Sequence, residues 1–457
     1  MPTYPKIVFG DVVLERDAIQ SATVTEEFSP LSITVPVGRM DVQLYSEDTD
    51  FAIVNPSGKF AGLVNRHPVV VYEMVSGKPV YIGQYYLEDW DNAGDNIIKL
   101  SFMDEIGLID SLTYKGGIWM TATSVGTLLQ EIFRGLDTQY ECDPDLAAVE
   151  LRGWIPICTY REAIQQVAFA AGAYVLAARQ EGYLKFGKLE PASSVKRGIR
   201  CGVPLTGQTR VYQKRWRKTE WFVFSSSNAV TRGICCGVPN AGQSRVYKKR
   251  WRASQWDKLE PVITIPASEQ GVVRGLGLRP QVTGVEVTFH DIVAGSGDKT
   301  LYEGELASGS HEITFGQPMH TLSVTGATIT ESGANYAILT VESAGEVSLT
   351  GKVYEDTQTV HGVYMSLPVT TKENILKVTD ATLVNSTNGA VLTRRLYDYY
   401  QQRYVQKLKL FAPTIKPGGS VILDSLYGRS LKGVVEKMSC DLSGGFLVQT
   451  EVVGIID

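Results

Sequence analysis

The chain has 457 residues, of which 44% are hydrophobic and 20% are charged, and its net charge is −5. This composition excludes wholesale disorder, and the length exceeds what a single core of about 100–200 residues supports. The 44 glycines and 22 tyrosines favour turns and strands over long helices.

Neither a secretory signal nor a membrane span is expected. The first residues lack a basic region followed by an apolar core. The longest apolar stretch, 167–178, falls short of the roughly 18 residues that a membrane helix needs. The six cysteines form no Cys-x-x-Cys pair, which fits a reducing compartment such as a cytoplasm better than a disulfide framework.

The first ~115 residues read as strands joined by short turns. The runs 68–75, 80–90 and 96–102 are rich in β-branched and aromatic residues, and a Ser-Gly-Lys turn at 76–78 separates the first two. They predict a β-meander of the kind found in a small barrel or sandwich.

Two helices are predicted next. Val125, Leu128, Leu129, Ile132 and Phe133 form one apolar stripe, with Thr123 or Ser124 as the cap and Gly135 beyond the end. The second helix starts at Thr159, where Glu162 completes a capping box, and ends at Gly172. A hairpin is expected after it, with strands at 174–178 and 183–186.

Residues 197–256 contain a tandem repeat. Arg197–Trp221 and Arg232–Trp256 are offset by 35 residues and match at 17 of 25 positions. Each unit predicts two short strands around a Gly-Val-Pro…Gly-Gln turn. The segment 197–256 carries a net charge of +12, which leaves −17 for the rest of the chain. Such asymmetry predicts contact with an acidic surface.

Cations alternate with aromatic residues in both repeats, a pattern that suits phosphates and bases, anionic glycans or stacking on a neighbouring subunit. Three interpretations remain open: the basic segment packs on the acidic part of its own complex, it binds a polyanion, or it is a solvated face. The candidate polyanion or partner contacts are Arg210, Tyr212, Lys214, Arg215, Trp216, Arg217, Arg245, Tyr247, Lys249, Arg250, Trp251 and Arg252.

Strands are predicted again from about 282 to 365. A helix is expected over 391–404, where Leu392, Leu396, Tyr399 and Tyr400 share a face. The chain is expected to end in strands over 420–456.

No motif predicts catalysis, a metal or a cofactor. None of the five histidines has a partner at metal-ligand spacing. The aspartates around position 91 fail the calcium-loop pattern, because Ala93 and Leu100 occupy ligand positions, so a hairpin turn is expected there. Cys158 precedes a capped helix, which can lower a thiol pKa, but a structural cysteine is the stronger interpretation.

The order of several stretches resembles the central hub proteins of phage baseplates and tail tips, including those of tailocins. The stretches that carry this resemblance are 69–72, 83–87, 100–104, 154–156, 160–164, 182–186, 335–336, 350–354 and 416–454. They cover most of 1–190 and 260–457, and the duplicated basic segment departs from the family pattern.

The resemblance implies a mainly β, multidomain chain with α+β portions: two tail-tube-like β-barrels plus α/β and β outer domains. It places the first barrel at 1–111, an α/β domain with two helices and a hairpin at 112–191, and the duplicated basic insertion at 192–260. Part of the second barrel follows at 261–299, a β outer domain at 300–363, and a helix with the rest of the second barrel at 364–457.

The resemblance also implies a function. Three chains would form a homotrimer that joins the sixfold tail tube to the distal tip, in a virion tail assembled in the host cytoplasm. The implied partners are a tail tube or distal tail protein, the tape-measure protein, tip or fibre proteins, and DNA in the lumen. Two alternatives remain: a tail-associated module that binds an anionic host glycan or nucleic acid through the basic repeats, and a tail-associated wall hydrolase.

Overall fold

A computed structural model describes residues 4–15, 18–45, 57–60, 64–94, 96–178, 183–188, 263–268, 270–271, 275–366, 372–411, 415–425, 428–443 and 447–456. These residues are mainly β and form several sheets, as the sequence predicts. Within these ranges, no helix combines the length and the apolar character that crossing a membrane requires.

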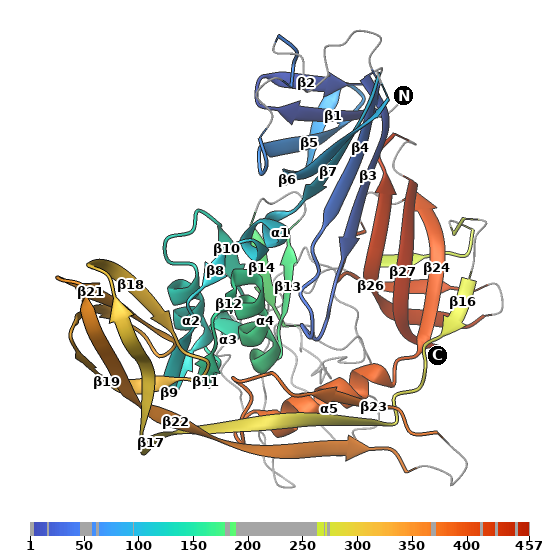
Figure 1. Cartoon of the computed structure of the whole chain (residues 1–457). Helices are drawn as coiled ribbons and strands as arrows, with labels where there is room; N and C mark the ends of the chain where they lie inside the picture. Colours follow the sequence, from blue (N-terminus) through green and yellow to red (C-terminus); the bar gives the residue numbers. More distant parts are fainter. Residues whose placement is uncertain are drawn as a thin grey trace, which may run out of the picture.

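The largest sheet has 13 strands drawn from both ends of the chain (Figure 1). Its order is β16-β24-β27-β26-β3-β4-β7-β6-β5-β1-β2, and β15 and β25 attach beside β26. The strands are β1 (Tyr4–Phe9), β2 (Val12–Glu15), β3 (Ile19–Glu27), β4 (Arg39–Tyr45), β5 (Pro68–Val75), β6 (Lys78–Gly94), β7 (Ile97–Met103), β15 (Ile263–Ile265), β16 (Gly275–Leu278), β24 (Tyr404–Phe411), β25 (Ser420–Asp424), β26 (Ser430–Asp441) and β27 (Leu447–Ile456).

The two parts of this sheet meet where β3 pairs with β26 in antiparallel register. Thr23 lies opposite Asp441 and Glu27 lies opposite Lys437. Where the sequence resemblance implies two barrels, the described strands form one continuous sheet, and no described pairing closes it into a barrel.

Alternating burial explains why this sheet has one apolar face. In β1, every second residue, Ile7 and Phe9 among them, is buried, and β5 alternates in the same way. One hydrophobic cluster combines residues such as Phe102 with Val435 and Val452, so the first and last parts of the chain share a core. The meander predicted at 68–102 is confirmed. The hairpin turn predicted around position 91 is not there, because β6 continues through Asp89 and Asp91 to Gly94 and pairs with β7 along this stretch.

A compact α/β unit follows β7 and lies near the centre of the molecule (Figure 1). Its helices are α1 (Glu105–Asp110), α2 (Val125–Ile132), α3 (Pro144–Ala147) and α4 (Tyr160–Ala171). Its strands are β8 (Thr113–Tyr114), β9 (Gly117–Ser124), β10 (Tyr140–Cys142), β11 (Glu150–Ile155), β12 (Cys158–Thr159), β13 (Tyr174–Ala177) and β14 (Leu184–Gly187). The predicted hairpin is the antiparallel pair β13–β14.

Local signals define two of these helices. The capping box between Thr159 and Glu162 is present, and α4 ends at Gly172, whose φ of 68° is the left-handed conformation that glycine adopts readily. Ser124 caps α2, and the predicted apolar stripe is buried. The helix ends at Ile132 with Phe133 as its C-cap, two residues before Gly135.

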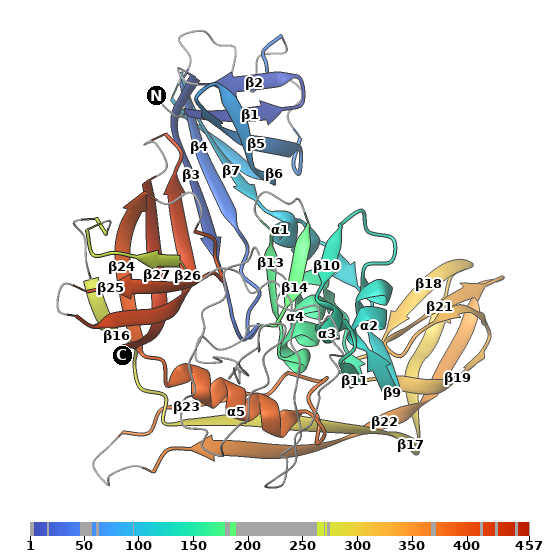
Figure 2. The ribbon, with the colours of Figure 1, turned by 180° about the vertical axis from the view of Figure 1, so that it is seen from behind.

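A long two-stranded ribbon runs beneath the molecule and carries a small β unit at one end (Figures 1 and 2). The ribbon pairs β17 (Gly284–Leu306) with β22 (Gly345–Tyr364). The remaining strands are β18 (Gly309–Thr314), β19 (Met319–Thr325), β20 (Thr328–Ser332), β21 (Tyr336–Val341) and β23 (Ile375–Val378). A separate core that includes Leu339 and Leu349 holds the small unit together.

The last helix, α5 (Gly389–Tyr400), packs on the ribbon (Figure 2). The sequence predicts it over 391–404, so the helix begins two residues earlier and ends four residues earlier than expected. The early end has a tertiary cause, because Tyr404 starts β24 and lies opposite Gly454 of β27. Leu392 and Leu396 of the predicted face are buried.

Candidate functional site: joints, open edges and a central pocket

The basic residues predicted to contact a polyanion or partner, from Arg210 to Arg252, lie outside the described residues, as does the whole segment 192–260. Their role stays a prediction. The described residues offer three other kinds of functional feature: polar joints between units, unpaired strand edges, and a pocket.

Charged pairs lie at the junction between the two parts of the large sheet. Lys437 of β26 pairs with Glu27 of β3. Arg279, which follows β16, pairs with Glu436 and also donates to Tyr399 Oη of α5 at 3.1 Å. Burial raises the pKa of Glu436, and the hydrogen bond from Arg279 acts in the opposite direction. The Arg279 guanidinium therefore links the segment after β16 to the desolvated carboxylate of β26 and to α5.

Asn335 joins the small β unit to the α/β unit. Its side chain is 1% exposed and donates through Nδ2 to the carbonyl oxygens of Lys115 (3.0 Å) and Ile155 (2.9 Å). Its Oδ1 accepts from Trp154 Nε1 at 2.5 Å. A Cβ on Gly116 would lie 2.2 Å from Asn335 Nδ2, so the backbone there must be glycine. The amide thus satisfies three polar groups of a unit far away in sequence.

The segment between β3 and β4 is held by two helices. Arg161 of α4 donates to Val35 O at 2.7 Å and forms an ion pair with Asp110. Arg395 of α5 donates to Pro30 O at 2.5 Å, and burial lowers the pKa of Arg395 to about 10. Hydrogen bonds therefore tie the large sheet to both helices.

Among the open strand edges in the described part of the chain, three are candidate contact sites. The large sheet ends in β16 on one side and β2 on the other, where Leu278 is 60% and Val13 is 51% exposed. The third edge belongs to β22, because its pairing with β19 covers only residues up to Val353. Unpaired edges present N–H and C=O groups that another chain can pair with.

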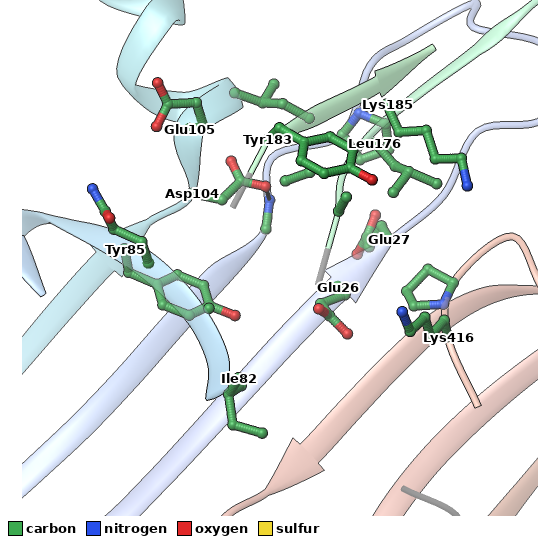
Figure 3. Close-up of a pocket in the computed structure, with 18 of the residues that line it drawn as sticks. Glu26, Glu27, Ile82, Tyr85, Asp104, Glu105, Leu176, Tyr183, Lys185 and Lys416 are labelled. Atoms are coloured by element: carbon green, nitrogen blue, oxygen red, sulfur yellow. Dashed lines mark hydrogen bonds between the residues drawn. The ribbon is translucent and has the colours of Figure 1, made fainter. Parts of the chain in front are cut away.

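A pocket of about 270 Å³ lies where the first strands, the α/β unit and the C-terminal strands meet (Figure 3). Glu26 and Glu27 come from β3, Tyr81 to Tyr86 from β6, Lys185 from β14, and Lys416 from the segment before β25. Asp104 and Glu105 lie at the start of α1, and Asp137 and Tyr174 complete the polar lining. The pocket thus gathers five carboxylates, five tyrosines and two lysines.

Asp104 is the most buried of these carboxylates. It caps α1 by accepting from Gly107 N at 3.1 Å, and it accepts from Gly38 N at 2.8 Å. Burial raises the pKa of Asp104 to about 7, against the lowering effect of these backbone donors. A cap residue that links β4 to α1 therefore titrates near neutral pH.

Glu105 is fixed by two hydroxyl groups. Tyr86 Oη donates to its Oε2 at 2.5 Å, and Thr138 Oγ1 donates to its Oε1 at 2.7 Å. Burial, followed by the hydrogen bond to Glu105, raises the pKa of Tyr86. On this side of the pocket, the neutral phenol of Tyr86 is therefore hydrogen-bonded to the side chain of Glu105.

The cysteine singled out in the sequence is not activated. Burial and the charge of Glu162 raise the pKa of the Cys158 thiol to about 12, so the helix start does not lower it. Over the described ranges, no three His, Cys, Asp or Glu side chains lie together as a metal site would require.

Sequence reasoning missed the pocket, the joints and the edge of β22. The pocket residues run from Glu26 to Gly418, so no local motif signals them. The stretch 335–336, which contributes to the family resemblance, contains Asn335, although nothing in the sequence identifies its partners.

No protein-family model matches the sequence, and no curated protein matches it either. Solved structures similar to the chain include three tail proteins. A tail protein from Neisseria meningitidis MC58 is 10% identical, with 99% of this chain and 97% of that chain covered and a TM-score of 0.49. The 43 kDa tail protein of prophage MuSo2 from Shewanella oneidensis is 9% identical, with 99% and 98% covered and a TM-score of 0.48. A prophage tail protein from Listeria monocytogenes EGD-e is 8% identical, with 98% and 94% covered and a TM-score of 0.45.

Proposed function

We propose that the chain is the structural hub of a phage-type tail tip or baseplate, a homotrimer that joins the sixfold tail tube to the distal tip. The single observation that carries this proposal is the continuous sheet built from both chain ends, with open edges at β2 and β16. An open edge at each end allows neighbouring copies to continue the sheet around a ring.

The two parts of the sheet, β1–β7 and β24–β27 with β15, β16 and β25, are proposed to act as the two tube-like barrel units. Two such units per chain give six units in a trimer, which matches a sixfold tube. The α/β unit and the small β unit would then be the outer domains. Partners on this proposal are a tail tube or distal tail protein, the tape-measure protein, and tip or fibre proteins, with DNA in the lumen.

The trimer is tested by native mass spectrometry of the full chain. We expect a species of three times 50.2 kDa. Leu278→Lys, which places a charge on the exposed β16 edge, should shift the population to monomer. The control Val64→Lys, at an equally exposed residue outside the sheet, should leave the trimer intact. If the trimer persists in the Leu278→Lys variant, β16 is not part of the subunit interface.

A second role is proposed for the duplicated basic segment, favoured by its charge of +12 against an acidic remainder. We propose that its alternating cations and aromatic residues form a contact for an acidic surface or polyanion. Charge reversal at Arg215, Arg217, Arg250 and Arg252 should weaken binding of the full chain to DNA or anionic glycans, with a reduced salt dependence. If binding to DNA and glycans is unchanged, the basic segment does not bind polyanions, and contact with an acidic protein surface is the role that remains.

A further inference from the structure

The small β unit is a separate body within the fold. Its core, which includes Leu339 and Leu349, shares no residue with the core of the α/β unit among the described parts of the chain. The two strands of the ribbon, β17 and β22, connect it to the rest of the molecule (Figure 2). A unit that has its own core keeps its structure when its position changes, and such units move relative to one another unless a large apolar interface holds them.

A narrow neck of the ribbon, residues 292–297 of β17 with residues 354–356 of β22, joins the two bodies. None of these residues belongs to a hydrophobic core of the described chain, and Val293 is 52% exposed. The register shifts between Ala294 and Asp298, so three residues of β17, with the sequence Gly-Ser-Gly, oppose one residue of β22. A bulge bends a strand pair, and two strands without a core are only marginally stable, so the ribbon bends most easily at the neck.

Contacts on either side set the limits of the hinge. Towards the α/β unit, Asp291 of β17 pairs with Arg152 of β11 at 3.3 Å. Towards the small unit, His320 Nε2 of β19 lies 3.1 Å from Gly295 O. The bulge is therefore held by the small unit, and bending is confined to residues 292–294 and the residues of β22 opposite them.

The joint that holds the small unit in place is polar. Asn335 makes three hydrogen bonds across it, two of them to the carbonyl groups of Lys115 and Ile155. Lys115 Nζ also lies 3.0 Å from a carboxylate oxygen of Glu312 and 4.4 Å from the centre of the Tyr336 ring. The side chains of this ion pair are 41% and 44% exposed, so the pair contributes little. Polar groups bind water when a joint opens, so this joint opens at a lower cost than an apolar interface would.

We propose that the small β unit is a hinged arm, latched on the α/β unit by Asn335 and Lys115, and that it turns on the neck when the latch opens. Opening uncovers two carbonyl groups and the indole N–H of Trp154 on the α/β unit, all of which another chain can bind. Hinge motions of this kind occur in microseconds to milliseconds. The inference does not depend on the trimeric hub, because the latch and the neck lie within one chain.

Pulsed electron paramagnetic resonance of the full chain tests the proposal, because it measures the distance between two spin labels. Labels at the exposed residues Ala148 of the α/β unit and Ser343 of the small unit report the position of the arm. Labels at Thr328 and Ser343, both within the small unit, report its internal structure. Noncanonical amino acids carry the labels, because native cysteines would also react with a thiol label.

Asn335→Ala combined with Lys115→Ala should open the latch. We expect the distance distribution between the two units to become about twice as wide and to shift to longer distances, because the neck then bends freely. The distribution within the small unit should stay as in the unchanged chain. Asn96→Ala combined with Lys99→Ala makes the same two substitutions at exposed residues elsewhere, and this control should change neither distribution.

A second variant, Asn335→Asp, keeps the side-chain volume but places oxygen atoms against the two carbonyl groups, so it should widen the distribution between the units in the same way. If that distribution stays narrow in both variants, other contacts fix the arm and the proposal is wrong. The proposal is also wrong if the distribution within the small unit broadens and amide hydrogen exchange in β21 accelerates, because the unit then loses its structure when the latch is removed.

Discussion

Asn335 shows how one side chain determines the placement of a whole unit. Its amide serves two carbonyl groups and one indole N–H across the boundary between the small β unit and the α/β unit. Buried polar groups that lose their partners cost about 1–3 kcal/mol each, so a joint built from three such bonds is sensitive to truncation.

Asn335→Ala should therefore lower the free energy of unfolding by about 2–4 kcal/mol, because the carbonyls of Lys115 and Ile155 are left without this donor. Urea denaturation of the full chain measures this. Asn96→Ala, at an exposed turn residue, should change it by less than about 0.5 kcal/mol. Equal effects of the two substitutions would show that the joint contributes little.

Asp104 gives the molecule a pH dependence with a definite sign. Its pKa rises from 3.8 in the unfolded chain to about 7 in the folded chain because of burial. The folded state then holds a proton that the unfolded state has released, so the contribution of Asp104 to stability is greatest below about pH 4 and falls as pH rises towards about 7.

We expect this group to contribute a slope of at most about 1.4 kcal/mol per pH unit in that window. Asp104→Asn should remove this contribution, although it also weakens the bond to Gly38 N and so lowers stability at every pH. Asp89→Asn, on an exposed part of β6, should keep the slope. Unfolding free energies measured from pH 4 to 7 that fall equally in both variants would contradict this assignment.

At the scale of elements, local chemistry predicts more than long-range pairing does. The capping box at Thr159 and the glycine at 172 specify α4 from neighbouring residues alone, and runs rich in β-branched and aromatic residues predict the meander. The pairing of Thr25 with Ser439 joins residues more than 400 positions apart, and no local pattern encodes it. Likewise, α5 ends early because Tyr404 pairs in a sheet, a tertiary effect that overrides helix periodicity.

Close packing of β26 against β27 provides a test at this scale. Gly433 and Gly454 lie opposite each other, and a Cβ on Gly454 would lie 1.9 Å from Lys432 O. Gly454→Ala should therefore cost about 1–3 kcal/mol of stability by forcing the strands apart. Gly297→Ala, where the added Cβ meets nothing within 4 Å, is the matched control. Thermal unfolding curves that shift alike in both variants would contradict this view of the pair.

At the scale of the whole molecule, the sequence predicts a mainly β, multidomain chain, and this is confirmed. The candidate polyanion or partner contacts between Arg210 and Arg252 lie outside the described residues, so their role stays a prediction. The pocket, the Asn335 joint and the open edges at β2, β16 and β22 depend on which distant segments meet. Burial patterns of single strands cannot supply that information, because they specify a face and not its partner.

The hub proposal concerns assembly, so its most direct test is the copy number and position of the chain in tail particles. Cryo-electron microscopy of particles from cells that express a tagged chain should find three copies in a ring at the distal end of the tail tube, with the large sheets of neighbouring copies side by side. Absence of the chain from the tail tip, or a copy number that is not a multiple of three, would contradict the proposed function.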